Sequence, residues 1–160
     1  MPTIRIRTIG SDDRAWIPGY IAERWGAPTV IAHGVVYRPQ ELQGFVAHSD
    51  DERIGLITYH VAEGECEIVS LNSDRRGSGI GTALLEAVKD AAWEKCCRRL
   101  WLITTNDNLD ALRFYQRRGF TLVAVHRNAM EASRRLKPEI PLIGEYGIPL
   151  HDEIELEMIL

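Results

Sequence analysis

Alternating apolar and polar residues predict strands along much of the chain. Within residues 3–9, the side chains of Ile4, Ile6 and Thr8 alternate with those of Arg5, Arg7 and Ile9, as in a half-buried strand. Residues 100–104 form a continuous apolar run, which is typical of a strand buried on both faces. The expected strands are 3–9, 45–48, 54–61, 66–71, 100–104, 121–126 and 152–160, and the three from 45 to 71 form an antiparallel meander. Two further short runs, Val30–Ala32 and Val35–Tyr37, are candidate strands.

Helical spacing appears between these strands. The expected helices are 11–25, 81–95, 109–118 and a shorter piece at 128–136. Ser11 is the predicted N-cap of the first helix and Gly26 its end, and Pro18 is expected to divide that helix into two pieces. The order of elements predicts one α/β (α+β) domain over residues 1–160 with a mixed sheet.

Composition narrows the class of protein. The 160 residues carry a net charge of −4, which argues against general binding of nucleic acid. The N-terminus lacks the apolar stretch of a signal peptide, and no segment has the roughly 20 apolar residues of a membrane helix. We therefore expect a cytoplasmic protein with no membrane partner. Cys66, Cys96 and Cys97 show neither disulfide nor zinc spacing, so we expect reduced thiols and no metal.

A glycine-rich segment joins a predicted strand to a predicted helix. It covers Arg76 to Thr82 and reads Arg-Gly-Ser-Gly-Ile-Gly-Thr. Glycine permits a close approach of the backbone to a ligand, and a helix start offers unpaired N–H groups. The segment therefore predicts a phosphate or pyrophosphate site, although a tight turn without an anion remains the alternative. Neither the P-loop nor the Rossmann pattern is matched.

Two sequence motifs occur between residues 76 and 120 of the predicted domain. Residues 76–81 match the pattern Arg/Gln-x-x-Gly-x-Gly/Ala, and residues 108–120 match Asn-x-x-Ala-x-x-Phe-Tyr-x-x-x-Gly-Phe. Together they resemble the signatures of the GNAT superfamily of acyl-CoA-dependent N-acetyltransferases. They occur in the family's order, and the similarity is clear over residues 66–126. The resemblance implies a mostly antiparallel mixed central sheet with helices on both faces. It also implies that strand 67–71 splays from the parallel strand 100–104 to form a cleft for coenzyme A.

By the same resemblance, the cleft binds acetyl-CoA as acyl donor. Leu71 and Ser73 are expected at the pantetheine chain, although the family often has proline at the position of Ser73. The expected pyrophosphate contacts are the backbone amides of Arg76, Gly77, Ser78, Gly79, Ile80, Gly81 and Thr82. Asn108, Ala111 and Tyr115 share one helix face by their i, i+3 and i+7 spacing, and that face is expected to point into the cleft.

Transfer to an amine needs a base and a proton donor. An alkylammonium must lose a proton before it attacks a thioester, and the departing thiolate can take one. Tyr115 is the predicted donor, and a purely packing role is its alternative. Glu67 is the predicted base, because the family often has a glutamate near this point. The other candidate bases are His33, His60 and His126, and Cys66 as an acyl-carrying nucleophile is a remote alternative.

Two features leave the acceptor open. Residues 133–149 are too long and too apolar for an ordinary hairpin loop, so they either cover the acceptor site or form a homodimer interface. Glu153, Glu155 and Glu157 share one face of the last strand, which is either solvated or an acidic wall for a cationic amine. The leading prediction is an N-acetyltransferase for a small-molecule or protein amine. The alternatives are a non-catalytic acyl-CoA sensor and a binder of another nucleotide.

Overall fold

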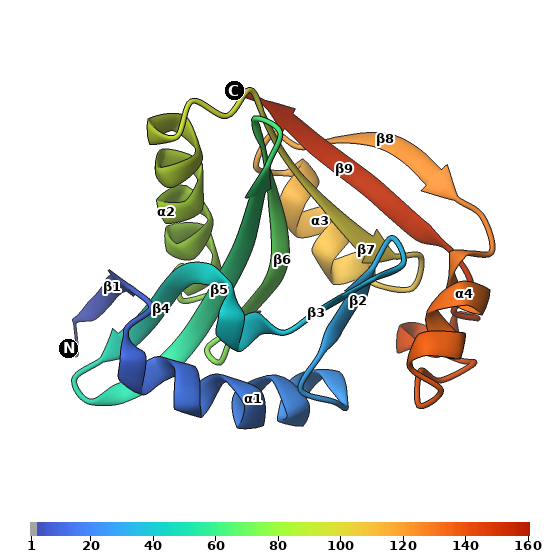
Figure 1. Cartoon of the computed structure of the whole chain (residues 1–160), viewed down its shortest axis with the longest axis horizontal. Coiled ribbons are helices and arrows are strands. Elements are labelled where there is room, and N and C mark those ends of the chain that lie inside the picture. The colour runs from blue at the N-terminus through green and yellow to red at the C-terminus, as the bar shows by residue number, and fades with distance from the viewer. Residues whose placement is uncertain (1–2) are drawn as a thin grey trace.

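The protein is built around one mixed sheet. The computed structural model describes residues 3–160, and its seven-stranded sheet has the order β1-β4-β5-β6-β7-β9-β8 (Figure 1). Only β6 and β7 pair in parallel, which confirms the predicted mostly antiparallel sheet. The strands are β1 (Ile4–Thr8), β4 (Gln43–Ser49), β5 (Glu52–Ala62), β6 (Glu65–Ser73), β7 (Arg99–Thr105), β8 (Thr121–His126) and β9 (Glu153–Ile159). The strands β2 (Val30–Ala32) and β3 (Val35–Tyr37) form a separate hairpin.

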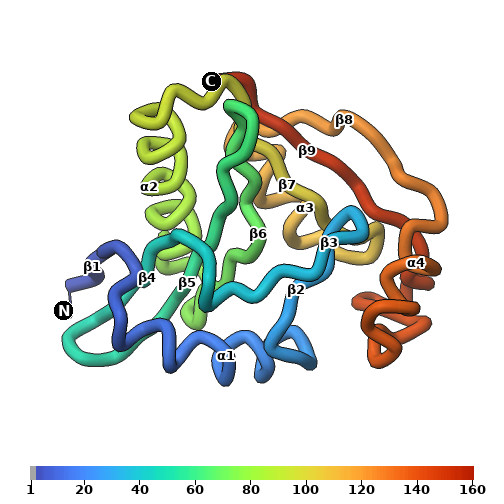
Figure 2. Tube along the Cα trace, in the orientation of Figure 1, coloured from blue at the N-terminus to red at the C-terminus, as the bar shows by residue number. Residues whose placement is uncertain are grey.

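Helices cover both faces of the sheet. The α-helices are α1 (Ser11–Trp25), α2 (Ile80–Glu94), α3 (Leu109–Gln116) and α4 (Ala129–Leu136), and the short 3₁₀ helices are η1 (Pro39–Glu41) and η2 (Glu145–Gly147). α2 and α3 share one hydrophobic core with the sheet, whereas α1 and the β2–β3 hairpin share a second. Figure 2 shows that α1 and α2 lie well apart in space, with α1 along the lower edge of the view and α2 at its upper left. None of the helices within residues 3–160 has the length and hydropathy needed to cross a membrane.

The start and the middle of α1 differ from the sequence prediction. The N-cap is Gly10 rather than Ser11, since Ser11 is already the first helical residue. The carboxylate of Asp13 accepts a 2.7 Å hydrogen bond from the Gly10 N–H, which stabilises this start. The helix also continues unbroken through Pro18. Ile17 and Ile21 are fully buried on either side of the proline, so packing against the sheet outweighs the lost hydrogen bond.

The central opening of the sheet lies between β6 and β7. Their pairing begins at Glu65 with Arg99 and stops at Ile68 with Leu102, although both strands continue beyond that point. Over this continuation, β6 stays paired with β5 and β7 stays paired with β9. The two strands therefore diverge from Ile68 onward, as the predicted splayed pair requires.

Candidate active site

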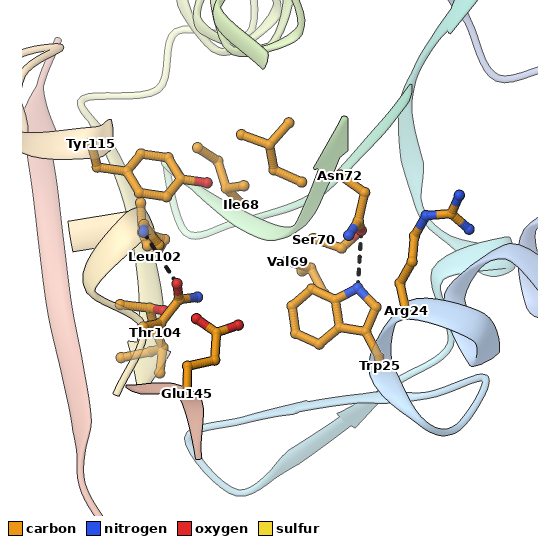
Figure 3. A pocket seen from close by; sticks show the side chains of 14 residues that line it. Arg24, Trp25, Ile68, Val69, Ser70, Asn72, Leu102, Thr104, Tyr115 and Glu145 are labelled. Carbon is orange, nitrogen blue, oxygen red and sulfur yellow. Dashed lines mark hydrogen bonds between the residues drawn. The ribbon is translucent and has the colours of Figure 1, made fainter. Parts of the chain in front are cut away.

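A cavity of about 230 Å³ occupies the opening between the two strands (Figure 3). Its floor and walls come from β6, β7, α3, the end of α1 and the segment before β9. The lining residues are Arg24, Trp25, Ile68, Val69, Ser70, Leu71, Asn72, Leu102, Ile103, Thr104, Asn108, Ala111, Tyr115 and Glu145. Leu71, Asn108 and Tyr115, all named from the sequence, thus meet at one cavity.

The glycine-rich turn presents free backbone donors at the start of α2. Gly77 and Gly79 have φ angles of 72° and 82°, where a side chain is strained. Gly79 is the N-cap of α2, and no side chain caps the helix. The first amides of α2 are therefore available to an anion, which the helix dipole favours further.

The side chains of the other residues in and near this turn contact protein groups rather than the cavity. Ile80 is buried in the core, and Gly81 packs against Phe114, which a Cβ atom would approach to 3.3 Å. The Thr82 hydroxyl accepts a hydrogen bond from Arg118. The Ser73 and Ser78 hydroxyls both donate to the Arg75 carbonyl, and they are not among the residues lining the cavity.

Arg76 links the turn to α3. Its guanidinium lies 2.9 Å from a carboxylate oxygen of Asp110, and Asp110 also accepts a 2.7 Å hydrogen bond from the Tyr146 hydroxyl. These two donors hold the pKa of Asp110 below its ordinary value. The carboxylate of Asp110 therefore connects the glycine-rich turn to the segment before β9.

Tyr115 is buried in the wall of the cavity. It lies on α3, whose N-cap Asn108 accepts a hydrogen bond from the Ala111 N–H. Its ring packs edge-on against Phe114 and Phe120, and its hydroxyl points into the cavity (Figure 3). Within residues 3–160 this hydroxyl has no hydrogen-bond partner, so the alternative of a bond to a backbone carbonyl is not observed. Burial raises the pKa of Tyr115, which keeps the hydroxyl protonated.

Glu67 lies on the opposite face of the sheet, at the point where the strands separate. It is in register with Trp101, one residue before the last β6–β7 pair. Its side chain is only 3% exposed, and it contacts two groups of the β2–β3 hairpin. His33 Nε2 lies 2.8 Å from one carboxylate oxygen, and the Tyr37 hydroxyl donates to the other at 2.6 Å.

The remaining candidate bases and the candidate nucleophile lie elsewhere. His60 is exposed on β5, and His126 on β8 pairs with Glu155 at 3.0 Å. Burial raises the pKa of the Cys66 thiol to about 12, so it remains an unreactive thiol. Within residues 3–160 no group of three or more His, Cys, Asp or Glu side chains is placed to hold a metal.

The face formed by the last strand is more complex than either alternative considered from the sequence. Glu153 is buried and accepts a hydrogen bond from the His33 backbone N–H. Glu155 and Glu157 both pair with Arg99 of β7. These carboxylates are thus largely engaged with protein groups rather than freely solvated.

Trp25, Glu145 and Tyr37 are site residues that the sequence analysis missed. Trp25 ends α1 and donates from its indole to Asn72 at 2.9 Å. Glu145 projects into the cavity, where burial and the nearby Asp107 and Asp110 raise its pKa. The unusual length of segment 133–149 indicated that a residue such as Glu145 could belong to the site. Nothing in the sequence singled out Tyr37 apart from its position in a short predicted strand.

Hydrogen bonds near each end of segment 137–149 hold it against the rest of the protein. Lys137 is buried, and its ammonium donates to the carbonyls of Trp25 and Thr29. At the other end, the backbone N–H of Glu145 donates to Asp107 at 2.8 Å. Glu145 brings the segment to the edge of the cavity, and the two sequence-based alternatives, a cover over the acceptor site or a dimer interface, both stay predictions.

Comparison with known proteins identifies the family. A model of the Acetyltransferase (GNAT) family matches residues 12–120, so the chain belongs to this family. The chain is 46% identical over 142 residues to the uncharacterized protein YdhI of Bacillus subtilis (strain 168), which covers 88% of this chain and 89% of YdhI.

Solved structures agree with the fold. An IAA acetyltransferase from Bacillus cereus has a TM-score of 0.75 at 23% identity, covering 99% of this chain and 100% of that one. A GNAT family acetyltransferase from Elizabethkingia anophelis with acetyl-CoA bound has a TM-score of 0.70 at 21% identity, covering 98% of both chains. At these identities the similarity shows the fold alone.

Proposed function

We propose that the protein transfers an acetyl group from acetyl-CoA to a primary amine by direct attack within a ternary complex. The observation that carries this proposal is the opening between β6 and β7. Hydrogen-bonded strands separate the two faces of a sheet, but beyond Ile68 and Leu102 that barrier is missing. A proton donor, Tyr115, and a carboxylate, Glu67, lie on opposite faces beside this opening.

The residues present fit coenzyme A. The uncapped start of α2 suits a pyrophosphate, and the facing edges of β6 and β7 offer backbone groups to an amide-containing chain such as pantetheine. Bound acetyl-CoA supplies the thioester that is attacked. We assign the pyrophosphate to the amides of residues 76–82 and pantetheine to the edge at Leu71, with Ser73 close to the mouth and Asn108 on the opposite wall.

The protein groups then have separate tasks. Glu67 is the proposed base for the proton that the acceptor ammonium must lose, acting directly or through a neighbouring group, and Tyr115 protonates the departing sulfur. The register of β5 and β6 shifts between Thr58 and Tyr59, which leaves Val69 without a partner on β5. Val69 lines the cavity, and we assign its N–H to the carbonyl oxygen that becomes negative during attack.

The acceptor is proposed only as an amine, on a small molecule or a protein. Glu145 at the cavity favours a cationic acceptor. A homodimer through the exposed side chains of Leu142 and Ile143 remains a prediction, which light scattering at several concentrations would check.

Thiol release from acetyl-CoA across a panel of amines tests the proposed function. We expect at least one amine to accelerate release well above the rate with buffer alone, with an acetylated product of the expected mass. Binding of coenzyme A without release by any amine would instead support the non-catalytic sensor.

A further inference from the structure

We propose that His33 takes the proton from the acceptor ammonium, and that Glu67 holds His33 in the tautomer that can do so. This inference rests on the proposed acetyl transfer and adds to it the group that meets the amine. Glu67 then acts as a positioning residue rather than by direct contact with the acceptor.

The first reason is access. The Glu67 carboxylate is 3% exposed, whereas the His33 side chain is 32% exposed. Both oxygens of Glu67 are already engaged, one by His33 at 2.8 Å and the other by the Tyr37 hydroxyl at 2.6 Å. An ammonium that approaches from this face of the sheet therefore reaches the imidazole before it reaches the carboxylate.

The second reason is the tautomer. A carboxylate only accepts hydrogen bonds, so the neutral imidazole must carry its proton on Nε2 to satisfy Glu67. The lone pair of His33 is then on Nδ1, which has no hydrogen-bond partner within residues 3–160. A carboxylate that fixes one ring nitrogen as donor and leaves the other as acceptor is the arrangement that a general base needs.

The third reason is the rigid support of the ring. His33 occupies the two-residue turn of the β2–β3 hairpin with φ 42°, followed by Gly34 with φ 78°. Its backbone N–H donates to Glu153 at 3.2 Å, and its ring centroid lies 5.2 Å from that of Trp101. Trp101 is the register partner of Glu67, so the ring is held beside the start of the opening.

Within residues 3–160, two carboxylates are the charged groups that face His33. Glu67 of β6 and Glu153 of β9 face it with carboxylates, and Tyr37 of β3 contributes a neutral phenol. The ring centroids of Tyr37 and His60 of β5 lie 5.9 Å apart. His126 of β8 lies near Glu153, with its Nε2 3.0 Å from Glu155. The charged groups nearest to His33 are thus both negative.

The protons balance in this scheme. The acceptor ammonium gives one proton to His33 Nδ1, and its freed lone pair forms the C–N bond to the thioester carbonyl. The C–S bond then breaks, and the sulfur takes a proton from Tyr115. The amide nitrogen loses its second proton, which restores Tyr115 through solvent, while His33 returns its proton to water. One proton is released per acetyl group transferred.

Replacing His33 with Asn tests the inference without breaking the hairpin. Asn-Gly is a preferred pair for this turn, so H33N should fold normally. With spermidine, cadaverine, tryptamine and lysine amide as acceptors, we expect kcat/KM for the amine to fall about 100-fold at neutral pH, with KM for acetyl-CoA unchanged. The deficit should narrow as the pH approaches about 10.4, where alkylammonium groups deprotonate in solution. The control is H151Q, which removes an exposed imidazole paired with Asp152 and should leave both constants unchanged.

A second measurement reads the tautomer directly. ¹⁵N-histidine NMR of the wild-type protein should show His33 protonated at Nε2, and E67Q should weaken this preference. A His33 protonated at Nδ1 would overturn the inference, as would H33N with wild-type kcat/KM at neutral pH. If neither a small amine nor a protein amine accelerates thiol release by the wild-type protein, the proposed function fails and this inference with it. Wild-type turnover that H33N leaves unchanged rejects the role of His33 alone.

Discussion

Tyr115 combines an observed packing role with the chemical role that we propose for it. Its ring packs edge-on against Phe114 and Phe120, so the side chain contributes to the core whatever its hydroxyl group does. Its hydroxyl nevertheless faces the cavity without a protein partner within residues 3–160. Since burial raises its pKa, the hydroxyl stays protonated at neutral pH and can donate to a departing thiolate.

Replacing Tyr115 with Phe should separate these two roles. The ring remains, so the stability should change little, whereas kcat should fall about 10- to 100-fold. The loss should be smaller at low pH, where solvent supplies the proton, and KM for acetyl-CoA should be nearly unchanged. The matched control is Tyr59→Phe, because Tyr59 is also buried in this core but does not line the cavity. Wild-type kcat in Tyr115→Phe between about pH 6 and pH 9, with chemistry rate-limiting, would remove Tyr115 from the mechanism.

At the scale of elements, the turn before α2 and the segment before β9 border the cavity from different sides. The turn owes its form to glycines with positive φ, which is a local property. The segment owes its form to distant partners, since Lys137 reaches the end of α1 and Glu145 reaches Asp107. The two elements should therefore respond differently to substitution.

Replacing Gly79 with Val should abolish binding of coenzyme A. A Cβ atom at this position meets nothing within 4 Å, so the effect arises from strain at φ 82°, which would turn the amides of α2 away from the phosphates. Calorimetric titration with coenzyme A measures it. Gly64→Val is the control, since Gly64 has φ 76° in the β5–β6 turn, at the far end of β6. Equal affinity in Gly79→Val and wild-type protein would show that the turn is only structural.

Segment 139–148 should govern the choice of acceptor more than the affinity for the cofactor. Replacing it with a Gly-Ser linker, while keeping the buried Lys137, should leave coenzyme A binding within a few-fold and alter the ranking of amines. Equal losses in both would indicate a core or dimer role instead.

A single substitution isolates the charge within this segment. Glu145→Gln should raise KM for a cationic amine roughly five-fold, because a carboxylate attracts an ammonium by about 1 kcal/mol at an exposed site. Glu139→Gln alters an exposed carboxylate of the same segment and should have no such effect. If the two variants have the same KM, Glu145 does not contact the acceptor.

At the scale of the whole molecule, a buried carboxylate joins the first strand, the first helix and the start of β5. Asp13 is 1% exposed and pairs with Arg7 and Arg53 while it accepts the Gly10 N–H. The hydrogen bond from Arg7 is the main reason that the pKa of Asp13 lies far below its ordinary value.

This depressed pKa predicts how stability depends on pH. The folded protein keeps Asp13 ionised where the unfolded chain, with an ordinary pKa of about 3.9, takes up a proton. The contribution of Asp13 is therefore complete above about pH 5 and is lost as the pH falls below that value. Asp13→Asn should lower the free energy of unfolding by about 3 kcal/mol at neutral pH and flatten its dependence on acid, as urea titrations would show. A loss no greater than that of Asp12→Asn, an exposed neighbour, would contradict this prediction.

Much of the architecture could be predicted because its causes are local. Alternation and helical spacing depend on near neighbours, and they placed every strand of the central sheet within about three residues. The shared face of Asn108, Ala111 and Tyr115 follows from the same short-range geometry, and all three residues line the cavity. The prediction that Pro18 divides α1 was wrong. It considered only the local effect of proline on the helix, whereas the packing of α1 against the sheet decides whether the helix continues.

The sequence by itself therefore determined the strands, the helices, the glycine turn and the family. Only the tertiary structure decided which groups meet at the opening of the sheet. Glu67 and His33 are 34 positions apart, and Glu145 approaches Asp107 across 38 positions. Such contacts depend on strand order and on where one parallel pair stops bonding, and both follow from the packing of the whole chain rather than from any short stretch of it.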